Sequence, residues 1–517
     1  MSAPGYGSFP LTGDALVDGM THGYYWVLGP DRTIDFSVSN GFQGEYWYNI
    51  SLVNNYVNAV VNSFGAYANI KFNNLGNYST PLEANSVGSE INVTLSGNKV
   101  LFPSSNIWAM GFFDPNTATI YAGQVGDIYL NINSQANYLP SYAPGTAGFA
   151  LLLHELGHTF GLKHPHDDGG TGRPTFIQLG EQALNVDWAT IMSYNDDYSW
   201  NLLQFEPATP MILDVLALQY LYGKNLSTNA GNTLFTLTTT NYYSTIWDPS
   251  GNDTVSVRGS KVNWTISLPS LTLSRLVDTK TGMAAPTNEL AFASPKTLYW
   301  LAGDIENAQG GDGNDVITGN SLNNMLNGGL GNDTLDGGDG LDFAIYANPK
   351  SSFTITKNTI GYSVKGIEGS DTLINIERIQ FSTGTLALDI NATAGQVYRI
   401  YQAAFNRTPD KGGLGDWIYG MDHGMTLLDV SAGFIGSNEF KSVYGTNPSN
   451  SGLVTRFYNN VLHRAPEQAG FDYWINQIAS GLQSPTQVLT GFSESPENQL
   501  QVIGVIQNGI EYTNHIV

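Results

Sequence analysis

The chain has 517 residues, of which 41% are hydrophobic, and it has no cysteine and a formal net charge of −23. This length predicts two to four domains, and the absence of cysteine excludes disulfides, thiolate nucleophiles and cysteine-ligated metal sites. The acidic balance excludes the basic surface needed to bind nucleic acid or anionic lipid. No apolar run reaches about 18 residues, so we expect no membrane span. Because the first basic residue is Arg32, we expect no cleavable secretory leader, which leaves a cytosolic chain, a trimmed chain or export through another signal.

The first ~220 residues have the pattern of a mixed α/β domain. Residues 50–62 carry apolar side chains at helical spacing, and residues 126–132 alternate in part as in a strand. Residues 148–160 predict a second helix, which is followed at once by Gly161 as a stop signal.

This second helix contains a histidine pattern that is typical of a metal site. His154 and His158 are four residues apart and project from one face of a helix, so both imidazoles can bind one Zn²⁺. After a glycine turn, His164 offers a third imidazole, and three protein ligands plus water are the catalytic zinc pattern. Glu155 is rotated by about 100° from His154 and can reach a metal-bound water without being a ligand. The competing interpretation, chance histidines on a helix, is disfavoured by the full HExxHxxGxxHP spacing.

The full pattern resembles the long zinc motif of the metzincin metalloendopeptidases, and the later segment TIMSY, which ends at Tyr194, resembles their Met-turn. The resemblance implies that Met192 forms an apolar floor beneath the metal; its alternative role is that of an ordinary core residue. In the serralysin branch the Tyr194 position is an extra zinc ligand that swings away to stabilise the transition state. The resemblance further implies peptide hydrolysis, in which Zn²⁺ activates a water molecule. Glu155 accepts a proton from this water and delivers it to the leaving amine. Residues 108–113 are the candidate edge strand for an extended substrate, with a plain core strand as the alternative.

Residues 310–345 contain four units of the nonapeptide G-G-x-G-x-D-x-U-x, of which the second is degenerate. The glycines permit tight turns, the carboxylates favour a hard cation such as Ca²⁺, and the apolar U residues fill a thin core. These U residues are Ile317, Leu326, Leu335 and Ala344. A flexible linker is the competing interpretation, whereas the acids disfavour phosphate binding. The ligands expected here are Gly310, Asp312, Asp315, Gly319, Ser321, Asn324, Gly328, Leu330, Asp333, Gly337, Asp339 and Asp342.

These units resemble the RTX parallel β-roll that follows the protease domain in serralysins. Residues 247–254 resemble the family's WDxGGxDT calcium loop, with Ser250 in place of a glycine, and residues 229–233 resemble another calcium segment. Because the carboxylates repel one another without calcium, we expect folding coupled to metal binding. The resemblance implies secretion through a type I exporter that reads an uncleaved C-terminal signal. The upstream ligands that it implies are Asn229, Gly231, Thr233, Asp248, Ser250, Gly251, Asp253, Asp304 and Glu306.

The last ~125 residues carry a longer repeat, which predicts short helices joined by Pro and Gly turns. They resemble a helical repeat domain of unassigned function that is appended to many RTX and surface-layer proteins. Either a structural cap or a surface- or partner-binding module fits this segment, and its aromatic residues are expected to serve packing. Arg407, Pro409, Gly413 and Trp417 recur 57 residues later as Arg464, Pro466, Gly470 and Trp474, and Gly433-Phe434 recurs as Gly491-Phe492.

We therefore expect a multidomain chain with an α/β metzincin protease domain over residues 1–222, a parallel β-roll calcium domain over 223–392 and an all-α repeat domain over 393–517. The expected function is that of a secreted, monomeric zinc endopeptidase, with one catalytic Zn²⁺ and several structural Ca²⁺ ions. Its expected partners are protein or peptide substrates, the exporter and, through the C-terminal domain, a cell surface. The alternative is a calcium-dependent adhesive surface protein with a vestigial protease domain, against which the intact zinc motif argues. A cytosolic peptidase would leave the nonapeptides without a role.

Overall fold

The computed structural model describes residues 5–111, 125–134, 142–194, 205–290 and 295–515. The chain divides into two compact units, Met1–Asn320 and Ser321–Val517, which we describe one at a time. Within the described residues, no helix combines the length and apolar character needed to cross a bilayer.

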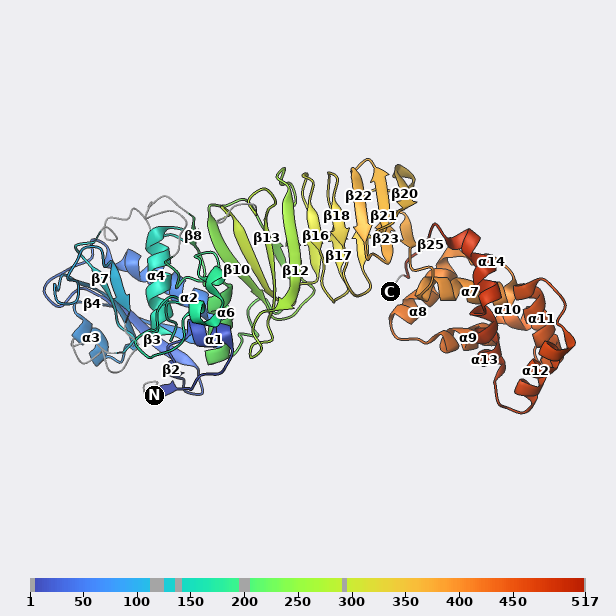
Figure 1. Ribbon diagram of the computed structural model, residues 1–517, viewed down its shortest axis with the longest axis horizontal. Helices are drawn as coiled ribbons and strands as arrows, with labels where there is room; N and C mark the ends of the chain where they lie inside the picture. The colour runs from blue at the N-terminus through green and yellow to red at the C-terminus, as the bar shows by residue number, and fades with distance from the viewer. Residues whose placement is uncertain (1–4, 112–124, 135–141, 195–204, 291–294, 516–517) are drawn as a thin grey trace. The chain divides into compact units, whose positions relative to one another are not determined.

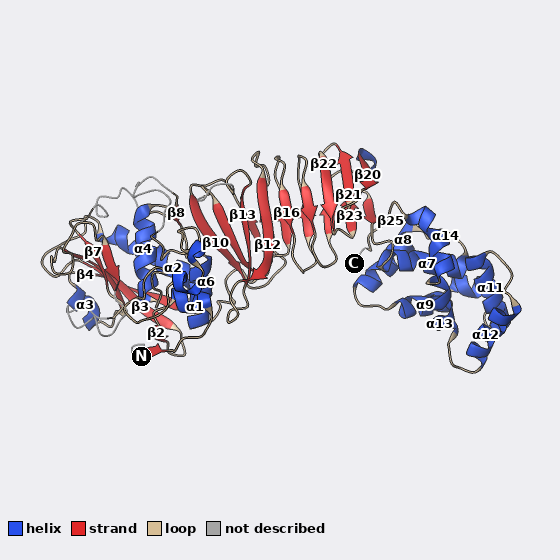
Figure 2. Cartoon of the chain, viewed as in Figure 1, coloured by secondary structure: helices blue, strands red, loops and turns tan. Residues whose placement is uncertain are grey.

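The first unit begins with an α/β region built around a five-stranded sheet (Figures 1 and 2). The strand order is β4-β3-β5-β7-β6, in which the first four strands are parallel and β6 is antiparallel to β7 at the edge. The elements of this region are β1 (Gly5–Ser8), α1 (Ala15–Met20), β2 (Tyr24–Val27), β3 (Thr33–Ser39), α2 (Ile50–Tyr67), β4 (Lys71–Tyr78), α3 (Pro81–Ser86), β5 (Ile91–Ser96), β6 (Ala109–Gly111), β7 (Ile128–Asn131), α4 (Ala147–Thr159), α5 (Phe176–Leu179), the 3₁₀ turn η2 (Gln182–Leu184), β8 (Glu206–Pro207) and α6 (Ile212–Tyr222).

The two helices predicted from periodicity are α2 and α4, and the predicted strand is β7. In α2, Val57, Val60, Val61 and Phe64 are fully buried, as their helical spacing requires. Helix α4 begins after Thr146, whose side chain caps the Phe149 amide. The chain leaves α4 through Gly161, whose φ of +89° is left-handed. A Cβ there would lie 2.4 Å from the Tyr24 carbonyl oxygen, so only glycine fits this turn.

The candidate edge strand at residues 108–113 is confirmed in its described part. Strand β6 covers Ala109–Gly111 and is the last strand of the sheet, so one of its sides carries no strand partner within the described residues. Residues 112 and 113 lie outside the described residues.

The second part of the first unit consists of short strands in two sheets. One sheet runs β8-β10-β14-β13-β12-β16 and the other runs β9-β11-β15, with parallel pairs such as β10 with β14 and β11 with β15. Buried Trp247, Val277 and Ala285 join the hydrophobic core of the α/β region, so both parts of this unit share one core. The elements are β9 (Leu234–Thr236), β10 (Tyr242–Asp248), β11 (Thr254–Ser256), β12 (Trp264–Thr272), β13 (Lys280–Pro286), β14 (Leu298–Gly303), β15 (Asn307–Gln309) and β16 (Val316–Thr318).

The second unit begins with further short strands. Its pairings run β18-β22-β21-β20 in one sheet and β17-β19-β23-β24-β25 in the other. The four U residues of the nonapeptides are at most 1% exposed, so the prediction that they form a thin core is confirmed. The elements are β17 (Met325–Asn327), β18 (Thr334–Asp336), β19 (Phe343–Ile345), the 3₁₀ turn η3 (Lys350–Ser352), β20 (Phe353–Lys357), β21 (Tyr362–Gly366), β22 (Ser370–Ile374), β23 (Arg378–Phe381), β24 (Gly384–Ala387) and, at the end of the chain, β25 (Ile510–Tyr512).

The rest of the second unit is helical, and the sequence repeat corresponds to two sets of four helices (Figure 2). In each set a tryptophan of the second helix packs on a phenylalanine of the third, with ring centroids 5.5 Å apart for Trp417 and Phe434 and 5.3 Å for Trp474 and Phe492. A Cβ at Gly433 would lie 2.4 Å from the Trp417 ring, so the repeated glycine admits the indole. The repeated aromatic residues therefore serve packing. The helices are α7 (Thr393–Phe405), α8 (Lys411–Asp422), α9 (Leu427–Gly436), α10 (Asn438–Tyr444), α11 (Asn450–Leu462), α12 (Gln468–Ala479), α13 (Pro485–Ser493) and α14 (Pro496–Ile506).

Candidate metal centre and active site

The three histidines of the zinc pattern converge. The Nε2 atoms of His154 and His158, both on α4, each lie 3.1 Å from Nε2 of His164, which follows the turn. Burial lowers the pKa of His154 to about 3 and holds the pKa of His158 well below its ordinary value. Both imidazoles are therefore neutral, which is the form that binds a metal. The three rings fit one tetrahedral ion such as Zn²⁺.

The other ring nitrogen of each histidine has an acceptor that holds its orientation. The Nδ1 atom of His154 donates to the Ile191 carbonyl at 2.7 Å, and that of His158 donates to the Leu162 carbonyl at 3.0 Å. The Nδ1 atom of His164 donates to Asp167 Oδ2 at 2.6 Å. A proton on each Nδ1 leaves the lone pair on Nε2, so all three lone pairs are directed into the shared centre.

Asp167 is the only carboxylate among these three acceptors, and its removal should weaken metal binding. We expect Asp167→Ala to raise the zinc dissociation constant by about 10- to 100-fold, because His164 loses the group that orients its ring and raises its basicity. Competition with a chromophoric chelator measures this constant. Asp168→Ala is the matched control, since Asp168 is exposed and its carboxylate accepts only from the Gly170 amide among the hydrogen bonds of the described residues. An equal zinc affinity in both variants would contradict the orienting role.

Glu155 lies beside the centre and is 5% exposed. Burial raises the pKa of its carboxyl to about 8, although a hydrogen bond from the Gly111 amide of β6 acts in the opposite direction. A carboxyl with a raised pKa is a stronger base once ionised, which suits a group that accepts and returns a proton near neutral pH. The contact with Gly111 also places the edge strand directly above α4.

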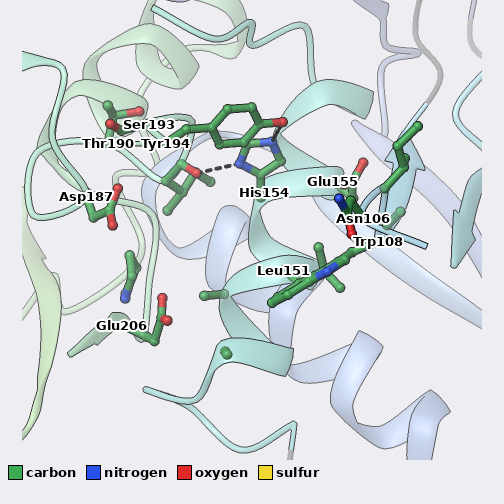
Figure 3. Close-up of a pocket in the computed structure, with 16 residues that line it drawn as sticks. Asn106, Trp108, Leu151, His154, Glu155, Asp187, Thr190, Ser193, Tyr194 and Glu206 are labelled. Carbon is green, nitrogen blue, oxygen red and sulfur yellow. Dashed lines mark hydrogen bonds between the residues drawn. The ribbon is translucent and has the colours of Figure 1, made fainter. Parts of the chain in front are cut away.

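Tyr194 and Met192 occupy two sides of the histidine cluster. The Tyr194 hydroxyl lies 3.5 Å from His154 Nε2, and its side chain is 56% exposed, so it reaches the centre from the solvent side (Figure 3). Met192 is fully buried, and a Cβ on Gly157 would lie 2.6 Å from its sulfur. The methionine therefore packs directly against the α4 backbone between the two histidines, where the Met-turn resemblance places it.

Asp214 supports the turn that contains Met192, and this role was not predicted from the sequence. It is fully buried at the start of α6 and accepts hydrogen bonds from the Thr190 hydroxyl at 2.6 Å and from the amides of Ile191 and Met211 at 2.8 Å. The Ile191 carbonyl in turn accepts from His154. Asp214 thus holds the peptide that orients the first histidine. Its signal in the sequence is a single acid within the apolar run of residues 211–218.

Removing this carboxylate should strongly destabilise the first unit. In Asp214→Ala three buried donors lose their acceptor, and each such loss costs about 1–3 kcal/mol, so the free energy of unfolding should fall by at least ~3 kcal/mol. Urea unfolding followed by tryptophan fluorescence measures the change. Glu83→Ala is the control, because exposed Glu83 accepts a hydrogen bond from the Ser79 amide at the start of α3. A loss as small as that of the control would show that the donors find other acceptors.

A pocket with a volume of about 390 Å³ opens beside the histidines (Figure 3). His154, Glu155 and Tyr194 line it, and so does Trp108, which precedes the edge strand. Acidic side chains from segments far along the chain, Asp187 and Glu206 among them, also line it. The centre is therefore reached through a cleft that contacts both α4 and the start of β6.

The upstream candidate calcium ligands come together in the first unit. The Thr233 amide donates to Asp253 Oδ1 at 2.6 Å, and the Asp253 amide donates to Glu306 Oε2 at 2.7 Å. A Cβ on Gly251 would lie 2.4 Å from Asp253 Oδ2 and 2.8 Å from the Gly231 carbonyl oxygen. The Asp304 amide donates to the Asp248 carbonyl, and the Asn229 amide group donates to the Trp247 carbonyl. Ser250 donates its backbone N–H to Asp248 Oδ1.

This cluster fits a hard cation. Buried Oδ2 atoms of Asp248 and Asp253 accept no hydrogen bond from the described residues. Burial, together with nearby Asp253 and Glu306, raises the pKa of Asp248 to about 7. Buried carboxylates that lack donors are stabilised by a metal ion, and an all-oxygen set is typical of Ca²⁺.

The nonapeptide residues show the same chemistry. In the first unit, Asp315 accepts from the amides of Gly311 and Trp264 at 2.7 Å. In the second unit, Asp342 Oδ1 accepts from the Asn324 amide at 2.8 Å, while its buried Oδ2 accepts no hydrogen bond from the described residues. A Cβ at Gly328 or Gly337 would lie within 2.6 Å of a repeat carboxylate oxygen, so these glycines leave the carboxylates room. Leu330, Asp312, Asp339 and Ser321 are exposed, whereas Gly310 and Gly319 are buried within their turns.

Three further acids lie beside the repeats and were not predicted from the sequence. The Asp342 amide donates to Glu377 Oε2 at 2.9 Å, the Asp333 amide donates to Asp371 Oδ1 at 3.0 Å, and the Glu368 carbonyl accepts from Gly331. A signal was present for one of them, because the run Asp371-Thr372-Leu373 repeats Asp333-Thr334-Leu335, and the two runs pair as parallel strands.

A centre of three histidines, two of them on one helix, with a buried glutamate beside it and an edge strand above it, is typical of a metallopeptidase site. Family models agree with this class. A model described as metallo-peptidase family M12B reprolysin-like matches residues 111–221, and one described as peptidase M10 serralysin C terminal matches residues 217–411. A domain of unknown function, DUF4214, matches residues 391–441 and 431–502.

Proteins with similar sequences narrow the class of metallopeptidase. Serralysin G of Dickeya chrysanthemi is 32% identical over 289 residues, which cover 50% of this chain and 56% of that protein. Metalloprotease AprA of Pseudomonas entomophila is 30% identical over 223 residues (39% and 42%), and serralysin of Proteus mirabilis is 31% identical over 199 residues (35% and 37%). The matches thus span about half, or less, of the length of these relatives. Residues 111–411 thus match models of a metallopeptidase and of a serralysin C-terminal region, and the helical region that follows matches a model of another family.

Proposed function

We propose that the chain is a zinc-dependent endopeptidase that cleaves extended peptide and protein substrates. The observation that carries this proposal is the convergence of three neutral imidazoles beside buried Glu155 in an open pocket. His154, His158 and His164 hold the ion, and Tyr194 is a further ligand from the solvent side. Names that describe the matched relatives as serralysins and metalloproteases support the assignment.

The residues of the site have distinct roles. A Zn²⁺ ion held by the three histidines would supply a Lewis acid for activating water and polarising the scissile carbonyl. Glu155 accepts the proton of that water and delivers it to the leaving amine. Once the Tyr194 side chain has moved away from the metal centre, its hydroxyl donates a hydrogen bond to the oxyanion of the substrate. The exposure of Tyr194 supports this role. Strand β6 offers to the substrate backbone the side that has no strand partner among the described residues, as a sheet edge does when it binds an extended peptide.

Azocasein hydrolysis tests this function. We expect 1,10-phenanthroline to abolish hydrolysis and added zinc to restore it, whereas the non-chelating isomer 1,7-phenanthroline should have no effect. Zinc-loaded protein that binds one ion per chain and cleaves neither casein nor a peptide library would contradict the proposal and favour the adhesive alternative.

The domain plan that we propose keeps the predicted boundaries: protease over residues 1–222, calcium-binding parallel β-roll over 223–392 and helical repeats over 393–517. Alternating parallel strands in two sheets and buried U residues support a β-roll. The Oδ2 atoms of Asp248, Asp253 and Asp342, which accept no hydrogen bond from the described residues, support several structural Ca²⁺ ions. The zinc and calcium ligands proposed are those predicted from the sequence.

Secretion through a type I exporter, as a monomer, completes the proposal, with the helical repeats as a module that contacts a cell surface or caps the roll. The calcium repeats support export, because low cytosolic calcium would keep the region unfolded until it leaves the cell. Export assays of chains truncated at residue 392 test where the signal lies. Normal export of this truncated chain would place the exporter signal outside the helical repeats.

A further inference from the structure

Within the described part of the chain, Tyr194 contacts three histidine rings, and only His166 among them stands outside the proposed zinc ligands. The centroid of the Tyr194 ring lies 5.3 Å from that of His154, 4.5 Å from that of His164 and 5.0 Å from that of His166. The His166 ring also stacks on the His164 ring, with centroids 5.0 Å apart and planes inclined by 10°. His166 directly follows the HExxHxxGxxHP pattern, which gives it no role.

These ring contacts matter because other contacts restrain Tyr194 only weakly. Its side chain is 56% exposed, and its hydroxyl lies 3.5 Å from His154 Nε2, at the outer limit for a hydrogen bond (Figure 3). A side chain in this situation can adopt several rotamers. Aromatic rings whose centroids are 4.5–7 Å apart attract one another, so the neighbouring rings favour one of these rotamers.

The His166 ring stands on a segment that is anchored on both sides. Pro165, which precedes it, is buried and has a fixed φ, and its carbonyl accepts from the Phe176 amide at 2.8 Å. Asp167, which follows it, accepts from His164 Nδ1 at 2.6 Å. A ring whose two neighbours in the chain are fixed can hold another side chain in place.

We propose that His166 is a positioning residue for Tyr194. Its ring forms a wall against which the phenol packs, so that the Tyr194 hydroxyl stays within reach of the metal and of the oxyanion. His166 acts through this ring contact and binds neither the ion nor the substrate. The inference rests on the proposed function, in which Tyr194 is a zinc ligand and a donor, and it adds a residue that the zinc motif does not contain.

Copper-substituted protein reports the position of Tyr194 without any turnover. Imidazole ligands bind Cu²⁺ as well as Zn²⁺, and a tyrosinate on Cu²⁺ gives a visible charge-transfer band. Tyr194→Phe should lack this band and so identifies it. We expect His166→Ala to weaken the band by about 2- to 10-fold, because alanine no longer holds the phenol in place.

Two variants control for other effects of this substitution. His166→Phe keeps a ring at the position and should keep the band. His423→Ala should also keep it, and it is a matched control because His423 is an exposed histidine whose ring lies 3.9 Å from that of Tyr419 in the second unit.

Hydrolysis by the zinc-loaded protein gives a second measure. We expect His166→Ala to lower kcat for an internally quenched peptide by about 2- to 10-fold with little change in KM, because the phenol donates to an oxyanion that forms only in the transition state. In the Tyr194→Phe background the same substitution should have no further effect.

The inference is overturned by an unchanged band in His166→Ala, or by a band that is lost equally in His166→Phe. An equal fall in kcat with and without the Tyr194 hydroxyl would overturn it too. A second copper ion per chain that His166→Ala loses would make His166 a metal ligand instead. If His166→Ala loads less than one copper ion per chain, His166→Leu, which has no ring, takes its place in the same comparison.

Failure of the inference can be distinguished from failure of the proposed function. Zinc-loaded wild-type protein that cleaves nothing would overturn the proposed function, while the copper band would still test the position of Tyr194. A wild-type copper protein without the tyrosinate band would overturn the inference and the assignment of Tyr194 as a ligand, while azocasein hydrolysis would still test the peptidase function.

Discussion

Glu155→Gln is expected to lower kcat/KM for peptide hydrolysis by about 10²- to 10⁴-fold and to leave zinc bound. Glutamine keeps the size of the side chain but cannot accept the proton of the attacking water. The three imidazoles keep their acceptors at Ile191, Leu162 and Asp167, so metal affinity should not change. An internally quenched peptide measures the rate, and metal analysis measures the zinc content.

The matched control is Glu497→Gln, which changes an exposed glutamate on α14. Full activity in this control and lost activity in Glu155→Gln would assign the effect to the site. Near-normal casein hydrolysis by Glu155→Gln, with one zinc per chain, would refute the general-base role. A variant that also loses its zinc would show that the buried glutamate holds the α4 ligands in place.

Removal of calcium is expected to unfold the β-strand region of the chain. Without a cation the buried carboxylates of Asp248 and Asp342 lie close to other acids, and their Oδ2 atoms accept no hydrogen bond from the described residues. Circular dichroism in EGTA should therefore lose strand signal that millimolar calcium restores, with midpoints of about 10⁻⁴–10⁻³ M, as in extracellular calcium modules. Identical spectra with and without calcium would contradict the coupling between binding and folding.

The pH dependence of the metal-free protein has a defined sign. Burial raises the pKa of Asp248 and of Asp342 to about 7, above the value of about 3.9 for an unfolded aspartate. The folded state therefore binds more protons than the unfolded state between these values, and its stability falls as the pH rises. We expect calcium-free protein to melt at a higher temperature at about pH 5 than at about pH 8, and calcium to remove most of the difference.

A single substitution separates the effect of the buried carboxylate on the stability of the calcium-free protein from its effect on calcium binding. Asp342→Asn should stabilise the calcium-free protein, because a neutral amide replaces a buried carboxylate, and should weaken calcium binding. Asp472→Asn, on the exposed side of α12, is the control and should change neither quantity. If Asp342→Asn lowered stability in both conditions, the carboxylate would serve packing and hydrogen bonding instead of calcium.

Residues whose roles depend on local spacing could be identified from the sequence. The histidines of the centre lie within eleven residues, and the helical repeat of α4 alone places His154 and His158 on one face. The nonapeptide period likewise predicts which side chains face inward, because each unit repeats one turn. The helices α2 and α4 follow from the helical spacing of apolar residues, and the burial of Ile317 and Leu335 follows from the nonapeptide period.

Residues whose contacts lie far away in the sequence could not be identified from local spacing. Asp214 lies 24 residues after Thr190, from whose hydroxyl it accepts a hydrogen bond. Glu377 lies 35 residues after Asp342 and accepts a hydrogen bond from the Asp342 amide. Single acids such as these have no period or motif that distinguishes them from solvated surface charges. The same holds for Asp187 and Glu206, which only strands β8, β10 and β14 bring to one pocket.

The amino-acid sequence by itself determined the histidines that converge, the buried glutamate beside them and the nonapeptide core, since their geometry is contained in a few turns of backbone. Only the tertiary structure decided which carboxylate supports the turn at Met192, which acids line the pocket beside the histidines and which further acids lie against the repeats. These contacts join segments tens of residues apart, and their positions depend on how the sheets and helices pack rather than on local spacing.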